Sequence, residues 1–460
     1  MSYAKPGDWM DSAPYIADMN FSRFQMKVST DRYHSQQYQT RERDALWMRV
    51  WQIAGREDDI PAVGDWMEYR LFDQSWLLVR GRDGVVRGFV NACRHRGNRL
   101  CTGKGHSVRF NCTYHNWCYG LEGQLVAVAK PDFEGSLDEF IGSDKQDMGL
   151  LSTPVECFAG FIFLNPDPEA VPLAEFLGDA ADALAAYRIE EMVPVGINVR
   201  ERIDCNWKVI LDAFGEGYHT QGVHPELVGM VDLSKERFHN CGDHGISTVP
   251  FGEPDLDSVS SEEAIERFLA IPTTHFSGFK TVLPQFAAMV DEYRDADGTL
   301  RLPQGLAPRQ LLQEAARIAH TKAGLDVSAL TDRQMIDYQF WLLFPNVFMQ
   351  ICTGEATIII ADPDPDNDPH RCYWRVMTLQ WLRPEERAAQ RTELRDIPED
   401  EHFPYFLALE QDYRQMPLQQ KGLRNRSLTE LVLTRQEPRV AHFHSALDQW
   451  VGRDPIASVG

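Results

Sequence analysis

Two short segments of the chain each place a cysteine close to a histidine. Cys93 and His95 flank a single arginine, and Cys112 and His115 flank a Thr-Tyr pair, with residues 96–111 between the two pairs. Cysteine sulfur and imidazole nitrogen are both strong ligands for transition metals. The spacing therefore predicts one metal site that receives two thiolates and two imidazoles from two loops.

The order of these ligands limits what the site can hold. A zinc finger has two cysteines in one pair and two histidines in the other, whereas each pair here is mixed. Mixed pairs suit a [2Fe–2S] cluster in which two cysteines hold one iron and two histidines hold the other. The alternatives are a zinc knuckle and chance clustering in a chain with nine cysteines and fourteen histidines.

The same residues carry a resemblance to a known family. Cys93–Gly97 and Cys112–Trp117 resemble the Rieske motif of the large subunits of ring-hydroxylating oxygenases. Respiratory Rieske proteins have two further, disulfide-bonded cysteines in these loops; Cys101 and Cys118 lie at different offsets, so we expect no such disulfide. The resemblance implies a [2Fe–2S] cluster held by Cys93, His95, Cys112 and His115.

A second group of potential ligands lies about a hundred residues further on. Asp212, Glu216 and His219 are four and three positions apart, so they would share one face if the segment is helical. His224 lies five positions after His219, and Gly222 and Pro225 supply a break that can turn it back. Two imidazoles and one carboxylate, with other positions open, form the facial arrangement that binds non-haem Fe(II).

The resemblance supplies the carboxylate of this second site. Relatives carry a ligand aspartate on a late helix, and Leu409–Asp412 is similar to that segment. It implies a mononuclear Fe(II) held by His219, His224 and Asp412, with Glu410 as the competing carboxylate on another helix face. The structural alternative is a pair of histidines beside a turn and an aspartate on a solvated face.

The acidic residues before His219 have an implied role of their own. In the family, an acidic residue three positions before the first ligand histidine bonds to a Rieske histidine of the neighbouring subunit, and Glu216 occupies this place. We therefore expect Glu216 to be an inter-subunit electron bridge, with Asp212 as a further catalytic candidate. Many relatives have Asp here, while those that oxidise quaternary ammonium compounds have Glu. Another cluster, His239–His244, matches no motif and is expected to be a loop near the pocket.

Length and composition bound the remaining possibilities. A chain of 460 residues, 43% of them hydrophobic, can form a large core. Its formal net charge of −22 disfavours nucleic-acid binding, and no segment approaches the ~18 consecutive apolar residues of a membrane span. Nine scattered cysteines argue against a disulfide framework. We expect a cytoplasmic protein.

The elements that must position the ligands change character along the chain. Short β-branched and aromatic runs predict an antiparallel β module that ends near residue 165. Helical patterns flank it, the first expected to end at Gly55. The expected strands are 66–71, 75–80, 85–90, 197–206, 347–360 and 372–382, and the expected helices are 40–51, 173–187 and 405–419. An acidic turn is expected at 362–369.

These elements indicate an α+β protein. The resemblance implies an N-terminal antiparallel β Rieske [2Fe–2S] domain followed by a catalytic domain of helix-grip type with a large antiparallel sheet. The expected boundaries are 1–40 for an N-terminal arm that packs on the catalytic domain, 41–166 for the Rieske domain and 167–460 for the catalytic domain.

The resemblance implies a terminal oxygenase that uses O2 to dihydroxylate, monohydroxylate or O-demethylate a small organic substrate, as in aromatic hydrocarbon catabolism. Electrons would come from a separate ferredoxin or flavin reductase, because the chain lacks a dinucleotide fingerprint. A homotrimer is implied, with or without a small β subunit. The alternatives are an oxygenase of a quaternary ammonium compound, an electron-transfer protein without its own oxygenation, and a zinc-stabilised binding protein. The phenylalanines that are candidates to line an apolar pocket are Phe214, Phe268, Phe276, Phe279, Phe286, Phe340 and Phe344.

Overall fold

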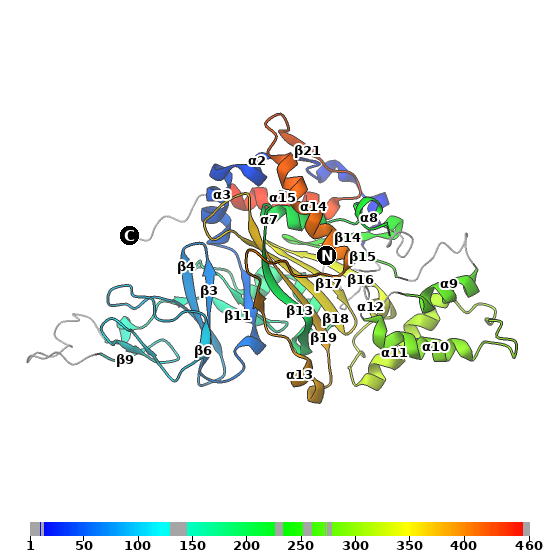
Figure 1. Ribbon diagram of the computed structural model, residues 1–460, viewed down its shortest axis with the longest axis horizontal. Helices are drawn as coiled ribbons and strands as arrows, with labels where there is room; N and C mark the ends of the chain where they lie inside the picture. The colour runs from blue at the N-terminus through cyan, green and yellow to red at the C-terminus, as the bar shows by residue number, and fades with distance from the viewer. Residues whose placement is uncertain are drawn as a thin grey trace, which may run out of the picture. The chain divides into compact units, whose positions relative to one another are not determined.

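The computed structural model describes residues 10, 13–128, 145–225, 233–251, 260–271, 273 and 278–453. The chain divides into two compact units. Residues Arg41–Phe176 form what we call the N-terminal β unit, and Met1–Thr40, Leu177–Asp364 and Asp368–Arg453 form what we call the large-sheet unit (Figure 1). None of the described helices is long and apolar enough to cross a membrane.

The N-terminal β unit consists of short antiparallel strands. They are β2 Gln52–Arg56, β3 Asp65–Leu71, β4 Gln74–Arg80, β5 Val86–Val90, β6 Lys104–His106, β7 Phe110–Asn111, β8 Cys118–Tyr119, β9 Leu125–Ala127, β10 Ser152–Thr153, β11 Val155–Phe158 and β12 Phe161–Leu164. Within the described residues they pair as β10-β5-β4-β3-β6, β11-β12-β2 and β7-β8-β9. The predicted strands at 66–71, 75–80 and 85–90 are confirmed as β3, β4 and β5.

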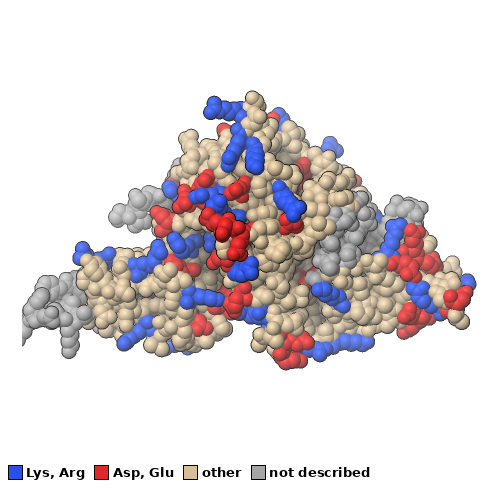
Figure 2. Space-filling model, in the orientation of Figure 1, with Lys and Arg blue, Asp and Glu red and all other residues tan. Residues whose placement is uncertain are grey.

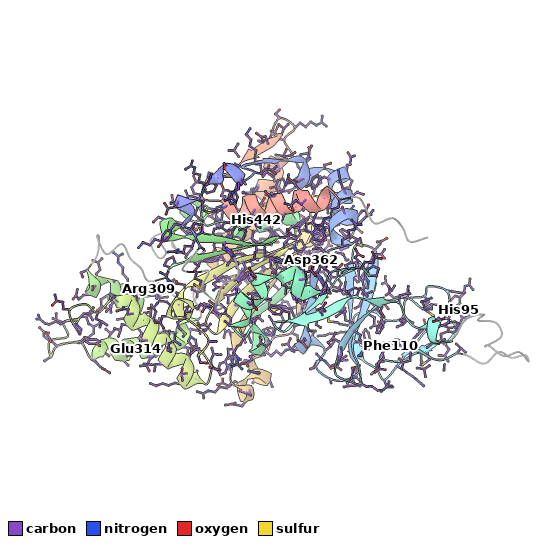
Figure 3. All side chains as sticks on the ribbon, turned by 180° about the vertical axis from the view of Figure 1, so that it is seen from behind. His95, Phe110, Arg309, Glu314, Asp362 and His442 are labelled. Carbon is purple, nitrogen blue, oxygen red and sulfur yellow. The ribbon has the colours of Figure 1, made fainter. Side chains whose placement is uncertain are left out.

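The two Cys/His loops are anchored in the core of this unit. Cys93 follows β5, and Cys112 follows β7. Both cysteines are buried in one apolar cluster with Phe89 and Phe110. Figure 3 labels Phe110 and His95, which belong to this part of the chain. The sheet therefore fixes the cysteine end of each loop.

The large-sheet unit is built on a long antiparallel sheet. Its strands are β13 Met192–Ile203, β14 Arg237–Cys241, β15 His244–Val249, β16 Tyr338–Leu343, β17 Val347–Cys352, β18 Glu355–Pro363, β19 Cys372–Trp381 and β20 Arg395–Asp396. Among the described residues the order is β14-β15-β16-β17-β18-β19-β13-β20, with the β13–β20 pair parallel. The strands predicted at 197–206, 347–360 and 372–382 are confirmed, although the second is two strands joined by a tight turn.

Helices cover this sheet and extend from it. They are α2 Asp31–His34, α6 Asp179–Ala185, α7 Trp207–Phe214, α8 Thr220–Val223, α9 Ser261–Leu269, α10 Phe279–Asp291, α11 Pro308–Ala323, α12 Asp332–Ile336, α13 Pro384–Gln390, α14 Leu407–Leu423 and α15 Pro438–Val451. Helices α7, α14 and α15 lie over the sheet, whereas α9 to α11 form a separate helical group between β15 and β16 in the sequence (Figure 1). The late helix predicted at 405–419 is confirmed as α14.

The first and last parts of this unit also meet in a small sheet. Strand β1, Lys27–Ser29, pairs antiparallel with β21, Glu430–Val432. No local pattern predicts this pairing, because it joins segments that are far apart in the chain. Acidic and basic side chains are interspersed over the face shown in Figure 2, as expected where many of them form ion pairs.

Two helix predictions were wrong in detail. The pattern at 40–51 is an α-helix, α3 Gln36–Glu42, followed by a π-helical turn at Arg43–Trp47. The side-chain amide of Gln52 donates hydrogen bonds to the backbone carbonyls of Trp47 and Val50. The helical segment therefore ends before Gly55. Gly55 lies inside β2 instead, where a Cβ would come within 2.7 Å of the Met67 side chain.

The helix predicted at 173–187 is interrupted. It forms α5, Leu173–Leu177, and then α6, with Gly178 between them. Gly178 has φ 51° and ψ −137°, a conformation that residues with a Cβ avoid, so the helix cannot continue through it.

Candidate metal centres

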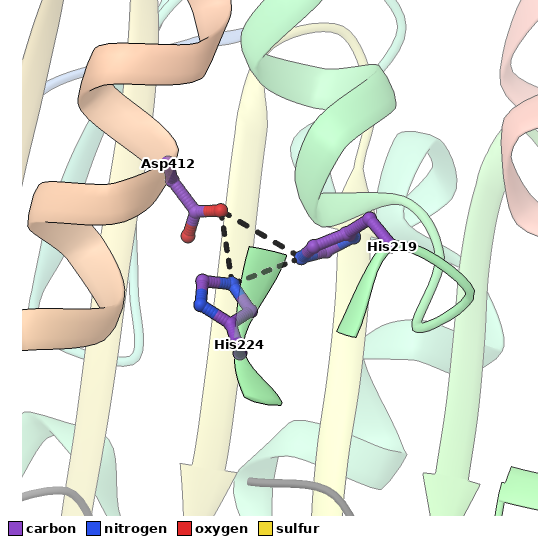
Figure 4. Close-up of side chains that lie close together, drawn as sticks. All are labelled: His219, His224 and Asp412. Carbon is purple, nitrogen blue, oxygen red and sulfur yellow. Dashed lines mark hydrogen bonds and ion pairs between the residues drawn. The ribbon is translucent and has the colours of Figure 1, made fainter. Parts of the chain in front are cut away.

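Three side chains of the large-sheet unit converge on one point. The His224 Nε2 atom lies 3.2 Å from His219 Nε2 and 3.0 Å from Asp412 Oδ1, and His219 Nε2 lies 3.6 Å from the same oxygen. Figure 4 shows the two imidazoles and the carboxylate pointing toward one another. Among the described residues, this is the group of three potential ligands whose atoms all lie within 4.8 Å of one another. We call it the histidine–aspartate trio.

The end of α7 sets the position of the two histidines. Asn206 caps the start of this helix by accepting a hydrogen bond from the Lys208 amide, and the following apolar residues are buried. The helix ends at Gly215, where a Cβ would meet the Leu211 carbonyl at 2.7 Å. The chain then turns and reaches His219 at the start of α8.

Each histidine is oriented by a hydrogen bond at its other ring nitrogen. The His219 Nδ1 atom lies 2.8 Å from Glu216 Oε1, and His224 Nδ1 lies 2.7 Å from Gln411 Oε1. Oxygen acceptors at both Nδ1 atoms favour the tautomer in which Nε2 carries a free lone pair. His224 and Asp412 are almost fully buried, which also holds their side chains in place.

These distances suit one metal ion. A metal bonded to three ligands at about 2.1 Å and at right angles would separate the ligand atoms by about 3 Å. The observed separations of 3.0, 3.2 and 3.6 Å are close to that value. Two imidazoles and one carboxylate form the set that binds non-haem Fe(II) with open positions, so the residues fit a mononuclear iron.

A cavity of about 180 Å³ opens beside the trio. Its wall is mostly apolar, and its aromatic members are Phe214, Phe340, Phe348 and Phe406. The rings of Phe214 and Phe348 stack with centroids 5.0 Å apart. Its polar members, besides the trio, are Glu216, Thr220, Glu236, Gln350, Thr357 and Arg439.

A buried arginine ties together three parts of the cavity wall. The Arg439 Nε atom donates to the Gly215 carbonyl at 2.9 Å, and its Nη1 donates to the Phe340 carbonyl. Its Nη2 lies 3.6 Å from Glu236 Oε1. Burial raises the pKa of Glu236, and the Arg439 charge opposes that shift. The opposite charges of Glu236 and Arg439 therefore compensate each other inside the cavity wall.

Asp212 is not on the same face as Glu216 and His219, so that prediction was wrong. The helix ends between them, and the Asp212 carboxylate accepts hydrogen bonds from the Tyr33 hydroxyl at 2.6 Å and from His444 Nε2 at 2.9 Å. Both partners come from segments far from Asp212 in the sequence. In the structure Asp212 fastens α7 to the N-terminal segment and to α15.

Glu410, which competes with Asp412 for the third ligand position, lies outside the trio. It lies 2.9 Å from His402 Nε2 and 2.8 Å from Arg414 Nε. It is absent from the trio and from the cavity wall, so the geometry favours Asp412 as the third ligand.

The second candidate centre lies in the N-terminal β unit. The rings of His95 and His115 are 4.4 Å apart, and His95 also stacks on Trp117. Cys93 and Cys112 are buried beneath them, while His95 is exposed. No disulfide joins any of the chain's nine cysteines, all of which fall in the described segments.

The surroundings of the Cys112 sulfur favour its thiolate form. Burial raises the pKa of Cys112, but hydrogen bonds from the Tyr114 and His115 backbone outweigh it, so the pKa is lowered overall. The Cys93 sulfur lies 3.2 Å from the Tyr119 hydroxyl, which itself accepts a hydrogen bond from the Arg94 amide. The inner thiolates and outer imidazoles fit a [2Fe–2S] cluster with one iron near the surface.

The remaining sequence candidates lie in structural positions. His239–His244 was expected to be a loop near the pocket, but it spans the end of β14, a tight turn and the start of β15, and none of its residues lines the cavity. His244 accepts a hydrogen bond from the Phe344 amide. Of the seven phenylalanines, Phe214 and Phe340 line the cavity. The members that are buried away from it are Phe268, Phe279, Phe286 and Phe344, and Phe276 lies outside the described residues.

Sequence reasoning missed several residues that surround the two centres. Gln411 precedes Asp412 directly, and this adjacency was the available signal for its contact with His224. Glu236 and Arg439 carried no local signal, because their pairing depends on the packing of α15 against the sheet.

Comparisons with known proteins agree with both centres. Residues 182–453 match the model of the ring hydroxylating alpha subunit (catalytic domain), and residues 50–138 match the model of the Rieske [2Fe-2S] domain.

Curated relatives include the biphenyl 2,3-dioxygenase alpha subunit of Rhodococcus jostii, 34% identical over 54% of this chain and 56% of that protein. The carnitine monooxygenase oxygenase subunit of Acinetobacter pittii is 27% identical over 58% of this chain and 72% of that protein. The matched part thus spans little more than half of the first relative.

Solved structures share the fold. Naphthalene 1,2-dioxygenase with bound indole superposes with a TM-score of 0.64 at 19% identity and covers 94% of this chain and 93% of its own. A quaternary ammonium Rieske monooxygenase in complex with L-carnitine gives a TM-score of 0.61 at 17% identity, over 95% of this chain and 97% of its own. With a Rieske domain ahead of a catalytic domain that accounts for more than half of its length, the chain belongs to the family of ring-hydroxylating alpha subunits.

Proposed function

We propose that this protein is a terminal oxygenase that uses O2 and externally supplied electrons to hydroxylate a small, uncharged and largely apolar organic substrate. The observation that supports it best is the cavity beside the histidine–aspartate trio. A metal held there would face an enclosed space of about the size that holds a single aromatic ring.

The residues of the chain would divide the work as follows. Cys93, His95, Cys112 and His115 would hold the cluster, and His219, His224 and Asp412 would hold the iron. The iron, when bound, supplies the activation of O2. The protein fixes the ligands, excludes water from the cavity and orients the substrate.

The charge balance of the cavity favours a neutral substrate. Glu236 is paired with Arg439, and Glu216 is bonded to His219, so the two acidic side chains of the wall outside the trio both have partners. The rest of the wall is dominated by apolar side chains. A charged substrate would therefore lose its hydration without gaining a dedicated partner.

A quaternary ammonium compound is the second candidate substrate. The observation that favours it is the stack of Phe214, Phe348 and Phe340, since ring faces attract cations. Proteins named as carnitine and glycine betaine monooxygenases are also among the relatives. An electron-transfer protein without its own oxygenation is the third candidate, and the preformed trio argues against it.

Electrons would enter at the exposed side of the cluster. His95 is exposed and adjoins His115, which suits contact with a separate ferredoxin or flavin reductase. We further propose that Glu216 passes electrons from the Rieske centre of a neighbouring subunit to His219, in a homotrimer. The 2.8 Å contact between Glu216 and His219 Nδ1 supplies the last step of that path.

The proposal is tested by a single turnover with isotopically labelled O2. The purified protein is reduced without O2, mixed with a neutral one-ring compound such as acetophenone or isopropylbenzene, and exposed to labelled O2. We expect labelled hydroxylated product from wild type and from Glu410→Ala, and none from Asp412→Ala. Product from Asp412→Ala, or no product from wild type with either neutral compound or with phenyltrimethylammonium, would contradict the proposal.

A further inference from the structure

Two polar side chains lie side by side in the apolar wall of the cavity. Gln350 on β17 and Thr357 on β18 are direct partners in the antiparallel register, so both side chains project from the same face of the sheet. Phe340 on β16 is the next residue in this row, as the partner of Gln350. All three line the cavity beside the histidine–aspartate trio. We call Gln350 and Thr357 the amide–hydroxyl pair.

Neither member of this pair makes a side-chain hydrogen bond within the described part of the chain. Both residues are half-buried, and both line the cavity. Two polar groups nearby are engaged in side-chain hydrogen bonds. Thr378, the next residue of the row on β19, bonds with its hydroxyl to backbone carbonyls of β13. Arg439 bonds to two carbonyls.

An unpaired amide and hydroxyl in an apolar cavity are costly unless a ligand or water satisfies them. If a substrate group displaces a bound water and makes the same hydrogen bonds as that water, the displacement costs little free energy. If a hydrocarbon displaces the water, the amide and the hydroxyl are left without partners. Such a pair would therefore discriminate between substrates by the groups that they present to β17 and β18.

We propose that the amide–hydroxyl pair binds a neutral hydrogen-bonding substituent of the substrate. The substituent is a carbonyl, hydroxyl or ether oxygen on an otherwise apolar molecule of one-ring size. The Gln350 amide would donate to this oxygen, and the Thr357 hydroxyl would donate to it or accept from it. This inference rests on the proposed oxygenase function, because it names the substrate class of the same site.

Charged or purely apolar substrates fit this wall less well. A carboxylate would face the nearby carboxylates of Glu216, Glu236 and Asp412. A quaternary ammonium group has no N–H to donate and cannot accept, so it leaves the pair unpaired, as a hydrocarbon does. A site built for a polar substituent rejects an analogue without one.

The test compares three ligands that share a phenyl ring. Acetophenone carries a carbonyl, isopropylbenzene is its hydrocarbon counterpart, and phenyltrimethylammonium is a quaternary cation. Their dissociation constants are measured by calorimetry on the intact, metal-loaded protein, without O2 or reductant. The variants are Gln350→Leu and Thr357→Val. The matched control is Gln380→Leu, which changes a half-buried glutamine on β19 that does not line the cavity.

We expect wild type and the control variant to bind acetophenone equally well. Gln350→Leu should raise the dissociation constant of acetophenone by about tenfold, the effect of one lost hydrogen bond. It should bind isopropylbenzene as tightly as wild type does, or more tightly. Thr357→Val should act in the same direction with a smaller effect. Phenyltrimethylammonium should not respond to either variant.

Equal loss of acetophenone and isopropylbenzene binding in Gln350→Leu would overturn the inference, as would unchanged acetophenone binding in both variants or no acetophenone binding to wild type. The visible spectrum of the cluster and the melting temperature check that each variant is folded. These results separate the inference from the proposed function. If the discrimination holds but no compound is hydroxylated, the oxygenase function fails; if products form but the variants do not discriminate, the inference alone fails.

Discussion

The Tyr119 hydroxyl lies 3.2 Å from the Cys93 sulfur and accepts a hydrogen bond from the Arg94 amide at 3.0 Å. When Cys93 is a cluster-bound thiolate, the hydroxyl is the donor in this contact. Hydrogen bonds to cluster sulfurs favour the reduced form, because they stabilise added negative charge. Tyr119→Phe should therefore lower the reduction potential on the order of 60 mV, the one-electron equivalent of about 1.4 kcal/mol. Redox titration of the cluster signal measures the shift.

Tyr114→Phe is the matched control for this change. The Tyr114 ring lies against His115 with centroids 3.8 Å apart, but its exposed hydroxyl makes no hydrogen bond in the described chain. The reduction potential of the cluster in Tyr114→Phe should equal that of wild type. An unchanged potential in Tyr119→Phe, or an equal shift in Tyr114→Phe, would refute this role for the Tyr119 hydroxyl.

Gln411 contacts a proposed iron ligand and is not itself a proposed ligand. Its carbonyl lies 2.7 Å from His224 Nδ1 and so fixes the ring that presents Nε2. Loss of such a contact usually weakens metal affinity by about tenfold or more. Gln411→Leu should lose its iron at a chelator concentration about tenfold or more below the one that wild type requires, measured at equilibrium. Gln415→Leu, which changes an exposed residue of the same helix, should require the same chelator concentration as wild type. Equal retention of iron by the two variants would contradict the prediction.

At the scale of elements, the start of α14 is held by a histidine between two carboxylates. His402 lies 2.7 Å from Glu201 on β13 and 2.9 Å from Glu410 on α14. Partial burial lowers the pKa of His402, but the hydrogen bonds and charges of the two carboxylates outweigh it and raise the pKa above its ordinary value. Protonated His402 therefore links β13 to the helix that carries Asp412.

This contact predicts a pH dependence of stability. Because the folded pKa is raised, the stabilisation is fully present below the unfolded pKa of about 6.5 and is lost as the pH rises through the folded value. The melting temperature of wild type should exceed that of His402→Gln by more at pH 6 than at pH 9, in calorimetric scans of both proteins. A difference that is the same at both pH values, or larger at pH 9, would count against the contact.

The sequence predicted the elements whose signals are local. Short β-branched and aromatic runs at 66–71, 75–80 and 85–90 identified β3 to β5, and the helical spacing near Leu409 identified α14. Pairings between distant segments, such as β1 with β21, have no such signal. The face of Asp212 was misjudged for the same reason, because the end of α7 depends on close packing at Gly215.

The candidate site was predictable in part. The two Cys/His pairs and the two histidines of the trio stood out by residue type and spacing. The cavity wall did not, because a phenylalanine in the helical group of α9 to α11 looks like Phe214 or Phe340 in the sequence. Gln350 and Thr357 are ordinary strand residues until the register places them together.

For the whole molecule, the proposed function requires electrons to pass from the cluster to the mononuclear iron. The Glu216 carboxylate touches His219, and it is the group that we propose to carry electrons from a neighbouring subunit. Glu216→Gln keeps an acceptor for His219 and should therefore retain the iron, but it removes the charge. We expect slower reoxidation of the reduced cluster by O2 in the presence of substrate, followed by stopped-flow absorbance.

Glu410→Gln is the control for the electron path, because it changes an acidic residue two positions from Asp412 that is bonded to His402. Its cluster should reoxidise at the wild-type rate. If Glu216→Gln reoxidises as fast as this control with both metal centres intact, Glu216 is not on the path.

One chain of this protein should hold two distinct iron centres. The most direct measurement is the content of iron and acid-labile sulfide, together with the EPR spectrum, of wild type, Asp412→Ala and Glu410→Ala. We predict about three irons and two sulfides per chain for wild type and Glu410→Ala, from one [2Fe–2S] cluster and one mononuclear iron. Asp412→Ala should keep the cluster signal and both sulfides but lose one iron. Colourless wild-type protein that holds zinc, or an Asp412→Ala variant that keeps all its iron, would contradict the account.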